Sequence, residues 1–293
     1  MKLLAYILIY PIILGISLLP FPIFYLLSDI ARFFIYNIFG YRRKMIQRNL
    51  SLSFPKMTDN ERLNIERSFY RHMCDIFLEM IKSLTLSPKS MRKHFKANNP
   101  DVLKKFSDNK KSVIVICGHY ASWEWMMSLA NQIGCPIYGI YTPLSNIYFD
   151  RLVTRIRKRY NAFVINRYKT YETIKQHYLD KHVAMYGFAS DQSPYPNEKT
   201  YWRTFMGVKV PVFTGAERIA KEFDIPIVYA DIKRVKRGYY EVDFRVLTDS
   251  PKTTKVNEIT DKFTEWLEEA IRRDPTQYLW SHNRFKYIDL APN

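Results

Sequence analysis

The chain has few cysteines, few acidic residues relative to basic ones, and no internal repeat. Its 293 residues include three cysteines, an odd number at spacings that match neither a zinc site nor a disulfide framework. No low-complexity tract or fixed-period repeat is present, which argues against disordered and solenoid architectures. Free cysteines favour a reducing compartment. The sequence also carries no signature of an RNA- or DNA-reading motif.

The shortage of acids leaves a formal net charge of +17. A positive field attracts nucleic acid, acidic lipid, phosphorylated substrates or an acidic carrier protein. The basic residues are spread along the chain in short clusters, such as residues 42–44, 155–159 and 233–237. For any single cluster, a solvated basic surface is an equally good explanation.

The N-terminal segment is apolar and free of charge from Leu3 to Ser28, which is long enough to cross a bilayer. A cleavable signal peptide fits less well, because the run is long and lacks a clear cleavage site. Its prolines predict a kinked or partly re-entrant segment, and residues 33–39 fit an interfacial position. We therefore expect a membrane anchor in residues 1–40 and a folded domain in residues 41–293.

Basic residues directly follow this segment at Arg42, Arg43, Lys44 and Arg48. Positive charge beside a membrane segment favours the cytoplasmic side and outweighs the single Lys2 at the other end. The sequence therefore predicts a domain that faces the cytoplasm, in agreement with the free cysteines.

The remaining chain has the pattern of an α/β protein. Thr58 and Glu61 match a capping box, and apolar residues at helical spacing follow as far as Ile81. A looser helical region is expected at about 88–106. Short apolar strands then alternate with helices, which is typical of a sheet covered on both faces.

The expected strands are 112–117, 136–141, 162–166 and 182–189, and the expected helices are 122–133, 146–160, 171–179, 214–223 and about 256–273. Residues 225–235 and 239–247 alternate around a glycine and predict a hairpin. The predicted fold class is therefore α/β: a single domain with a central mixed sheet flanked by helices, preceded by an N-terminal membrane-anchoring hydrophobic segment.

One candidate catalytic pair lies after the first buried strand. His119 follows this strand through Gly118, at the strand end where ligands gather in α/β sheets. Ser122 is expected to cap the next helix, which puts Glu124 in its first turn. A carboxylate bonded to one imidazole nitrogen makes the other nitrogen a better base. A purely structural histidine is the alternative, and the pair offers too few ligands for a metal site.

Other residues agree with a site at this edge. Asp191 follows the strand 182–189 and brings a second acid to a strand end. Arg151 and Arg155 lie one turn apart on an expected helix and face the same way, as anion-binding residues would. Thr214 begins a further helix. Cys117 is a possible thiol nucleophile, but a small buried hydrophobe is the better explanation.

These motifs resemble the bacterial lipid A late acyltransferases, which are similar to lysophospholipid acyltransferases. The resemblance covers nearly the whole chain in four blocks that occur in the family's order. The matching segments are His119 with Glu124, residues 141–151, residues 191–214 and residues 275–284. One position departs from the pattern, since Thr142 stands where a basic residue is common, so phosphate binding there is expected to differ.

The resemblance implies an O-acyltransferase of the inner membrane that uses an acyl carrier protein thioester as donor and a lipid A precursor hydroxyl as acceptor. His119 would be the general base and Glu124 its orienting partner. Arg151 would bind donor or acceptor, with Arg155 beside it, and Asp191 would support the site. His282 and Arg284 match the closing block, with a structural role as the alternative. No metal or cofactor is expected.

Two alternatives stay open from the sequence. The same chemistry fits another acceptor, such as an aminolipid, a lysophospholipid or a different glycolipid. A basic, membrane-tethered nucleic-acid-binding protein also fits the charge, although we expect no nucleic-acid partner because the motifs are missing. A catalytically inactive relative would not need both His119 and Glu124.

Overall fold

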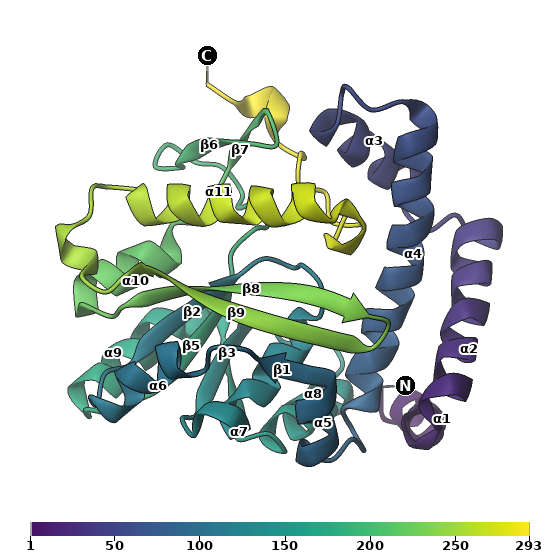
Figure 1. Cartoon of the computed structure of the whole chain (residues 1–293), viewed down its shortest axis with the longest axis horizontal. Helices are drawn as coiled ribbons and strands as arrows, with labels where there is room; N and C mark the ends of the chain where they lie inside the picture. The colour runs from purple at the N-terminus through teal and green to yellow at the C-terminus, as the bar shows by residue number, and fades with distance from the viewer. Residues whose placement is uncertain (1, 293) are drawn as a thin grey trace.

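The computed structural model describes residues 2–292 and shows a single mixed α/β domain built on one central sheet (Figure 1). The strand order in the sheet is β1-β9-β8-β2-β5-β3-β4. The strands are β1 (Phe95–Ala97), β2 (Val113–Cys117), β3 (Ile137–Tyr141), β4 (Ala162–Asn166), β5 (Met185–Ala189), β8 (Ile227–Lys236) and β9 (Tyr239–Thr248). All neighbours pair in parallel except the β8–β9 hairpin, so the predicted fold class is confirmed.

Helices cover both faces of the sheet. Strand β2 is buried at every position, as expected for the centre of a covered sheet. Figure 1 shows α11 along one face, with α6 and α7 on the other; α9 packs on α10, on the same face as α11. The helices are α3 (Arg43–Ser53), α4 (Asp59–Lys82), α5 (Pro88–His94), α6 (Asp101–Asp108), α7 (Ala130–Ile133), α8 (Ile147–Lys158), α9 (Thr170–Leu179), α10 (Gly215–Phe223) and α11 (Glu258–Arg273).

The capping box at the start of α4 is present as predicted. The Thr58 hydroxyl accepts a hydrogen bond from the Glu61 amide, and the Glu61 carboxylate accepts one from the Thr58 amide. The following 24-residue helix buries its apolar stripe, because its hydrophobic residues recur at helical spacing.

The looser helical region expected at 88–106 is interrupted by a strand. Residues 95–97 alternate buried, exposed and buried, and they pair with β9 at the edge of the sheet. Three residues are too few to show a strand period in the sequence, so the helical prediction is confirmed in α5 and α6 but was wrong at residues 95–97.

The helix expected at 122–133 is instead a 3₁₀ helix, η2 (Trp123–Leu129), followed by the single turn of α7. Ser122 does not cap it, so that prediction was wrong. The cause lies one residue earlier, where Ala121 has φ +51 and its amide donates to the Gln277 carbonyl. This left-handed residue turns the chain sharply and buries the Ser122 side chain away from the helix start.

A second, two-stranded sheet consists of β6 (Trp202–Phe205) and β7 (Val208–Pro211). Its turn residues, Met206 and Gly207, have φ +50 and +83. Two positive φ values define the hairpin turn that suits strand twist, which explains why a glycine stands at position 207.

The N-terminal segment folds as two helices outside the sheet. They are α1 (Lys2–Leu18) and α2 (Phe21–Phe33), and α2 continues into the π-helical turn η1 (Phe34–Ile38). The break at Leu19 and Pro20 confirms a kink. By length and composition, residues 21–38 form one helix that could cross a membrane. Figure 1 shows α2 alongside α4, with α1 at its foot.

Candidate active site

His119 lies two residues beyond β2, at the edge of the sheet where the parallel strands end. Gly118 brings it there by close packing, since a Cβ atom at position 118 would lie 2.6 Å from Cδ1 of Leu267 in α11. The main chain beyond is held by the C-terminal segment: the Leu279 amide donates to the His119 carbonyl. The imidazole therefore projects from a fixed backbone.

The partner of His119 is Asp191. Nδ1 of His119 and Oδ1 of Asp191 are 2.7 Å apart. The two residues meet because β2 and β5 are adjacent and in register, with Cys117 opposite Ala189. The Asp191 side chain is 2% exposed and that of His119 is 19% exposed. A neutral imidazole that donates from Nδ1 to Asp191 keeps its Nε2 lone pair free as a base.

The electrostatics of the pair favour this arrangement. Burial lowers the pKa of His119, but the Asp191 carboxylate, with a smaller contribution from Glu124, outweighs burial and raises it above the ordinary value. Burial acts to raise the pKa of Asp191, yet the charge and hydrogen bond of His119 hold it below its usual range. The carboxylate therefore stays ionised, and the imidazole is a stronger base than a free one.

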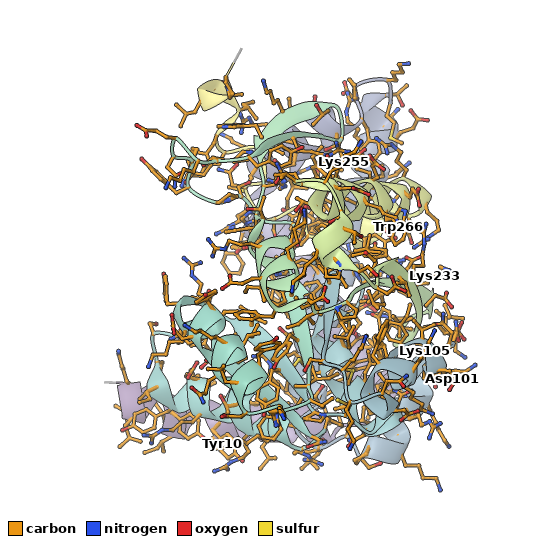
Figure 2. The ribbon with its side chains drawn as sticks, turned by 90° about the vertical axis from the view of Figure 1, so that its left-hand side faces the viewer. Tyr10, Asp101, Lys105, Lys233, Lys255 and Trp266 are labelled. Atoms are coloured by element: carbon orange, nitrogen blue, oxygen red, sulfur yellow. The ribbon has the colours of Figure 1, made fainter. Side chains whose placement is uncertain are left out.

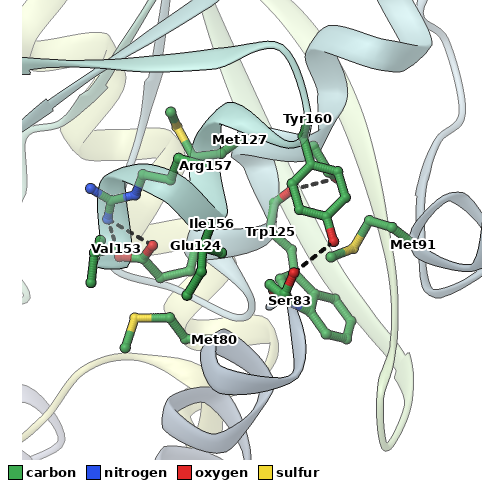
Figure 3. Close-up of a pocket in the computed structure, with 11 residues that line it drawn as sticks. Met80, Ser83, Met91, Glu124, Trp125, Met127, Val153, Ile156, Arg157 and Tyr160 are labelled. Atoms are coloured by element: carbon green, nitrogen blue, oxygen red, sulfur yellow. Dashed lines mark hydrogen bonds and ion pairs between the residues drawn. The ribbon is translucent and has the colours of Figure 1, made fainter. Parts of the chain in front are cut away.

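Glu124 has a different hydrogen-bond partner. Its two carboxylate oxygens accept from Nη2 of Arg157 on α8, at 3.1 and 2.9 Å (Figure 3). The interpretation of Glu124 as the hydrogen-bonded orienting partner of His119 was therefore wrong, because Asp191 occupies Nδ1. Glu124 nevertheless lies near enough for its charge to raise the pKa of His119.

A small cavity lies behind the Glu124–Arg157 pair. Figure 3 shows side chains from α4, α5, η2 and α8 around it. Its walls are mainly apolar and rich in methionine, with Met80, Met91 and Met127 among them. Since a lone carboxylate is costly against apolar walls, the ion pair with Arg157 compensates for the position of Glu124 there.

The rest of the site is supplied by aromatic and C-terminal residues. The amide Nε2 of Gln192 lies 3.4 Å from Nε2 of His119, so it faces the nitrogen that would act as base. The Trp123 ring packs edge-on against the imidazole with centroids 5.3 Å apart. Burial lowers the pKa of His282, which lies near Asp191, to about 4, so this second imidazole is neutral at physiological pH.

Arg284 ties the Asp191 loop to the C-terminal segment. Its Nη1 donates to the Ser193 hydroxyl and to the Pro211 carbonyl, and the Ser193 hydroxyl donates to the Arg284 carbonyl. Its side chain is 3% exposed. These contacts give Arg284 a structural role, which is one of the two roles that the sequence left open.

The remaining predicted residues lie farther out. Arg151 and Arg155 are both exposed on α8, and their side chains form no hydrogen bond or ion pair among residues 2–292. Thr214 precedes α10 without capping it through its side chain. Cys117 is buried, and burial raises the pKa of its thiol far above the ordinary value, which suits a packed hydrophobe better than a nucleophile.

Sequence reasoning missed the direct partners. Asp191 was placed at the right edge but not paired with His119, and Arg157 and Gln192 were not assigned to the site at all. The signal for Asp191 is the pairing of its strand with β2, which requires the strand order. For Arg157 no local pattern distinguishes it from its basic neighbours, because only helix packing turns it toward Glu124.

Comparisons with known proteins agree along nearly the entire chain. The sequence model described as "Bacterial lipid A biosynthesis acyltransferase" matches residues 2–287. A lipid A biosynthesis acyltransferase of Haemophilus influenzae is 28% identical over 280 residues, covering 93% of this chain and 87% of that protein. The lipid A biosynthesis palmitoleoyltransferase of Escherichia coli is 25% identical over 92% of this chain and 86% of its own. The lauroyltransferase of the same bacterium is 22% identical, with 92% and 87% covered.

Proposed function

Because the chain belongs to the bacterial lipid A biosynthesis acyltransferase family, we propose that it moves a fatty acyl chain from an acyl carrier protein thioester to a hydroxyl of a lipid A precursor or related membrane glycolipid. Two of its relatives are named for the acyl group they transfer, palmitoleoyl and lauroyl. Acyl transfer fits a site that offers a base but no exposed thiol nucleophile.

The observation that carries this function is the His119–Asp191 pair at 2.7 Å. In the proposed reaction, Nε2 of His119 takes the proton of the acceptor hydroxyl as its oxygen attacks the thioester carbonyl. The tetrahedral intermediate then collapses, the C–S bond breaks, and the leaving thiolate takes the proton back from His119. Asp191 fixes the tautomer and stabilises the imidazolium that forms in between.

Glu124 and Arg157 act beside this pair in the proposal. The carboxylate of Glu124 adds negative charge near the imidazolium, while Arg157 holds that carboxylate in place. Gln192 occupies the position next to Nε2 of His119 that the acceptor hydroxyl would take. When substrate binds, the Gln192 amide must therefore move away or stay beside Nε2 of His119 together with the acceptor hydroxyl.

Arg151 and Arg155 are proposed to bind the anionic parts of the substrates. Both face outward from α8, the helix that also holds Arg157. An acyl carrier protein is acidic and a lipid A precursor is phosphorylated, so a protein with a net charge of +17 attracts both. The expected location is the inner membrane, with residues 41–293 on the cytoplasmic side, because the donor is a cytoplasmic carrier.

Lipid analysis of a deletion strain tests the function. We expect one acyl chain to be missing from lipid A, with recovery when the wild-type gene is restored but not the gene for His119→Ala. Loss of an acyl chain from a phospholipid or aminolipid instead would show that the acceptor is a different lipid, while the reaction would still be acyl transfer. Unchanged lipids with tight RNA binding would contradict the proposal and favour a nucleic-acid-binding protein.

A further inference from the structure

The N-terminal helix pair exposes many large apolar side chains close together, as surfaces that contact membranes or other proteins do. Leu8, Ile12, Leu26 and Phe39 are between 59 and 74% exposed. The other large exposed apolar side chains on α1, α2 and η1 are Leu3, Leu4, Ile7, Ile9, Leu18, Ile23, Ile30, Phe33, Phe34 and Ile38.

Both ends of α1 are bound to the acyltransferase domain. At its start, Nζ of Lys2 donates to the Ser145 carbonyl and Nδ2 of Asn146 donates to the Lys2 carbonyl. At its end, Nζ of Lys82 donates to the Ser17 carbonyl, 2.9 Å away. The buried Lys82 thus satisfies a carbonyl that the helix end would otherwise leave unpaired.

One side of α1 also packs along its length on the domain. Tyr6, Tyr10, Ile13 and Leu14 lie against a small cluster of buried side chains from α8 and from the segment just after α4. A 17-residue helix is about 25 Å long. If α1 crossed the bilayer, its two ends would lie on opposite sides of the membrane. Because both ends contact the same domain, α1 cannot cross the bilayer.

Helix α2 is held in the same way along α4. The Tyr25 hydroxyl donates to Glu79 at 2.8 Å and the Ser28 hydroxyl to Asp75 at 2.6 Å. Asp29, the only acid between residues 2 and 44, pairs with Arg237 of the β8–β9 turn at 2.9 Å. The polar side chains on this face of α2 are therefore bonded to the domain, and the outer face that remains is apolar.

The two helices run crosswise rather than end to end. Figure 1 shows α2 lengthwise beside α4 and α1 nearly end-on at its foot, and Figure 2 shows α1 across the base of the molecule, with Tyr10 there and Lys255 at the opposite end. Two crossed helices can lie in one plane but cannot form a single straight span. Arg32, Arg42 and Lys44 carry positive charge in this part of the chain without an ion pair among the described residues, whereas Arg43 is paired with Glu66.

We infer that α1, α2 and η1 form an in-plane anchor that lies in one leaflet of an anionic bilayer and does not cross it. The apolar outer faces contact acyl chains, and the basic residues contact lipid phosphates. Both helices then stay on the same side as the active site. This inference rests on the membrane lipid substrate of the proposed function, but its tests do not measure acyl transfer, so the two fail separately.

Sidedness is the first test. Single cysteines at Lys2→Cys and Lys255→Cys in the full chain are labelled with a membrane-impermeant maleimide in spheroplasts and in inverted membrane vesicles. The native cysteines are buried and give little background. We expect both positions to react in the same preparation. Reaction of the two positions from opposite sides would overturn the inference in favour of a spanning segment.

Membrane binding is the second test. Leu8→Glu with Leu26→Glu places charges on the proposed lipid face, and Val235→Glu with Val256→Glu makes the same change at exposed valines outside it, 61 and 84% exposed. On vesicles containing phosphatidylglycerol, we expect the first pair to lower the bound fraction at least tenfold and the second to leave it unchanged. Equal binding by both would overturn the inference.

Discussion

Two neighbouring strand ends carry the acids of the site, and they use them differently. After β5, Asp191 is 2% exposed and bonded to His119. After β2, Glu124 is 23% exposed and bonded to Arg157. The acid 72 residues away from the histidine is its partner, while the acid five residues away serves another element. Strand pairing, more than distance along the chain, decides which groups meet.

The largest loss of acyl transfer is expected when the proposed base, His119, is removed. His119→Ala leaves both acids in place but no proton acceptor, so we expect transfer in a purified assay to fall by roughly 10²–10⁴-fold. An unchanged circular dichroism spectrum and membrane binding would show that the fold survives. Near-wild-type turnover in a folded variant would contradict the role of His119.

The next largest effect is expected at Asp191. Asp191→Asn keeps the shape but removes the charge that sets the tautomer and raises the pKa of His119, so we expect a loss of about 10²-fold in kcat. Asp289→Asn makes the same change at an exposed acid in the 3₁₀ turn Ile288–Leu290 and is expected to keep full activity. A loss no larger than that of the control would remove Asp191 from the proposed mechanism.

A smaller loss of activity is expected at Glu124, the acid that follows β2. Glu124→Gln still accepts a hydrogen bond from Arg157 but loses its charge, and we expect about a tenfold loss in kcat. If the two residues act as one unit, Glu124→Gln with Arg157→Gln is as slow as the worse single variant, since coupled residues are not additive. Strictly additive losses would mean that they act separately.

The smallest effect is expected at the exposed pair on α8. Arg151→Glu with Arg155→Glu repels an acidic donor without touching either acid of the site, so we expect KM for the acyl carrier substrate to rise about three- to tenfold with kcat nearly unchanged. The matched control, Lys252→Glu with Lys255→Glu, makes the same charge change far from α8. Equal rises in KM would indicate a general charge effect.

The sequence predicted the elements better than their contacts. Strands β2, β3 and β4 are mostly apolar runs and were located to within about one residue. The β8–β9 hairpin and the α4 capping box are present as expected. The short strand β1 and the 3₁₀ helix η2 were not foreseen, because a three-residue edge strand has no period and the turn at Ala121 depends on the distant Gln277.

In the site, too, the positions of the residues were predicted better than their contacts. His119 and Asp191 were placed at one edge of the sheet because both follow apolar strands. Their pairing was not predicted, since it depends on β2 and β5 being neighbours although two strands separate them in sequence. The burial of Arg157 against Glu124 likewise results from how α8 packs on η2, which no local spacing encodes.

The pH dependence of acyl transfer tests the central claim most directly. Only neutral His119 can accept a proton, and Asp191 raises its pKa above 6.5, so we predict that kcat/KM of the wild type falls as pH drops through a value above 6.5. In Asp191→Asn this acid limb moves to lower pH, because burial then dominates, whereas in Glu124→Gln it moves less. An acid limb that is unchanged in Asp191→Asn, or that moves only in Glu124→Gln, would contradict the assignment of Asp191 as the partner of the catalytic base.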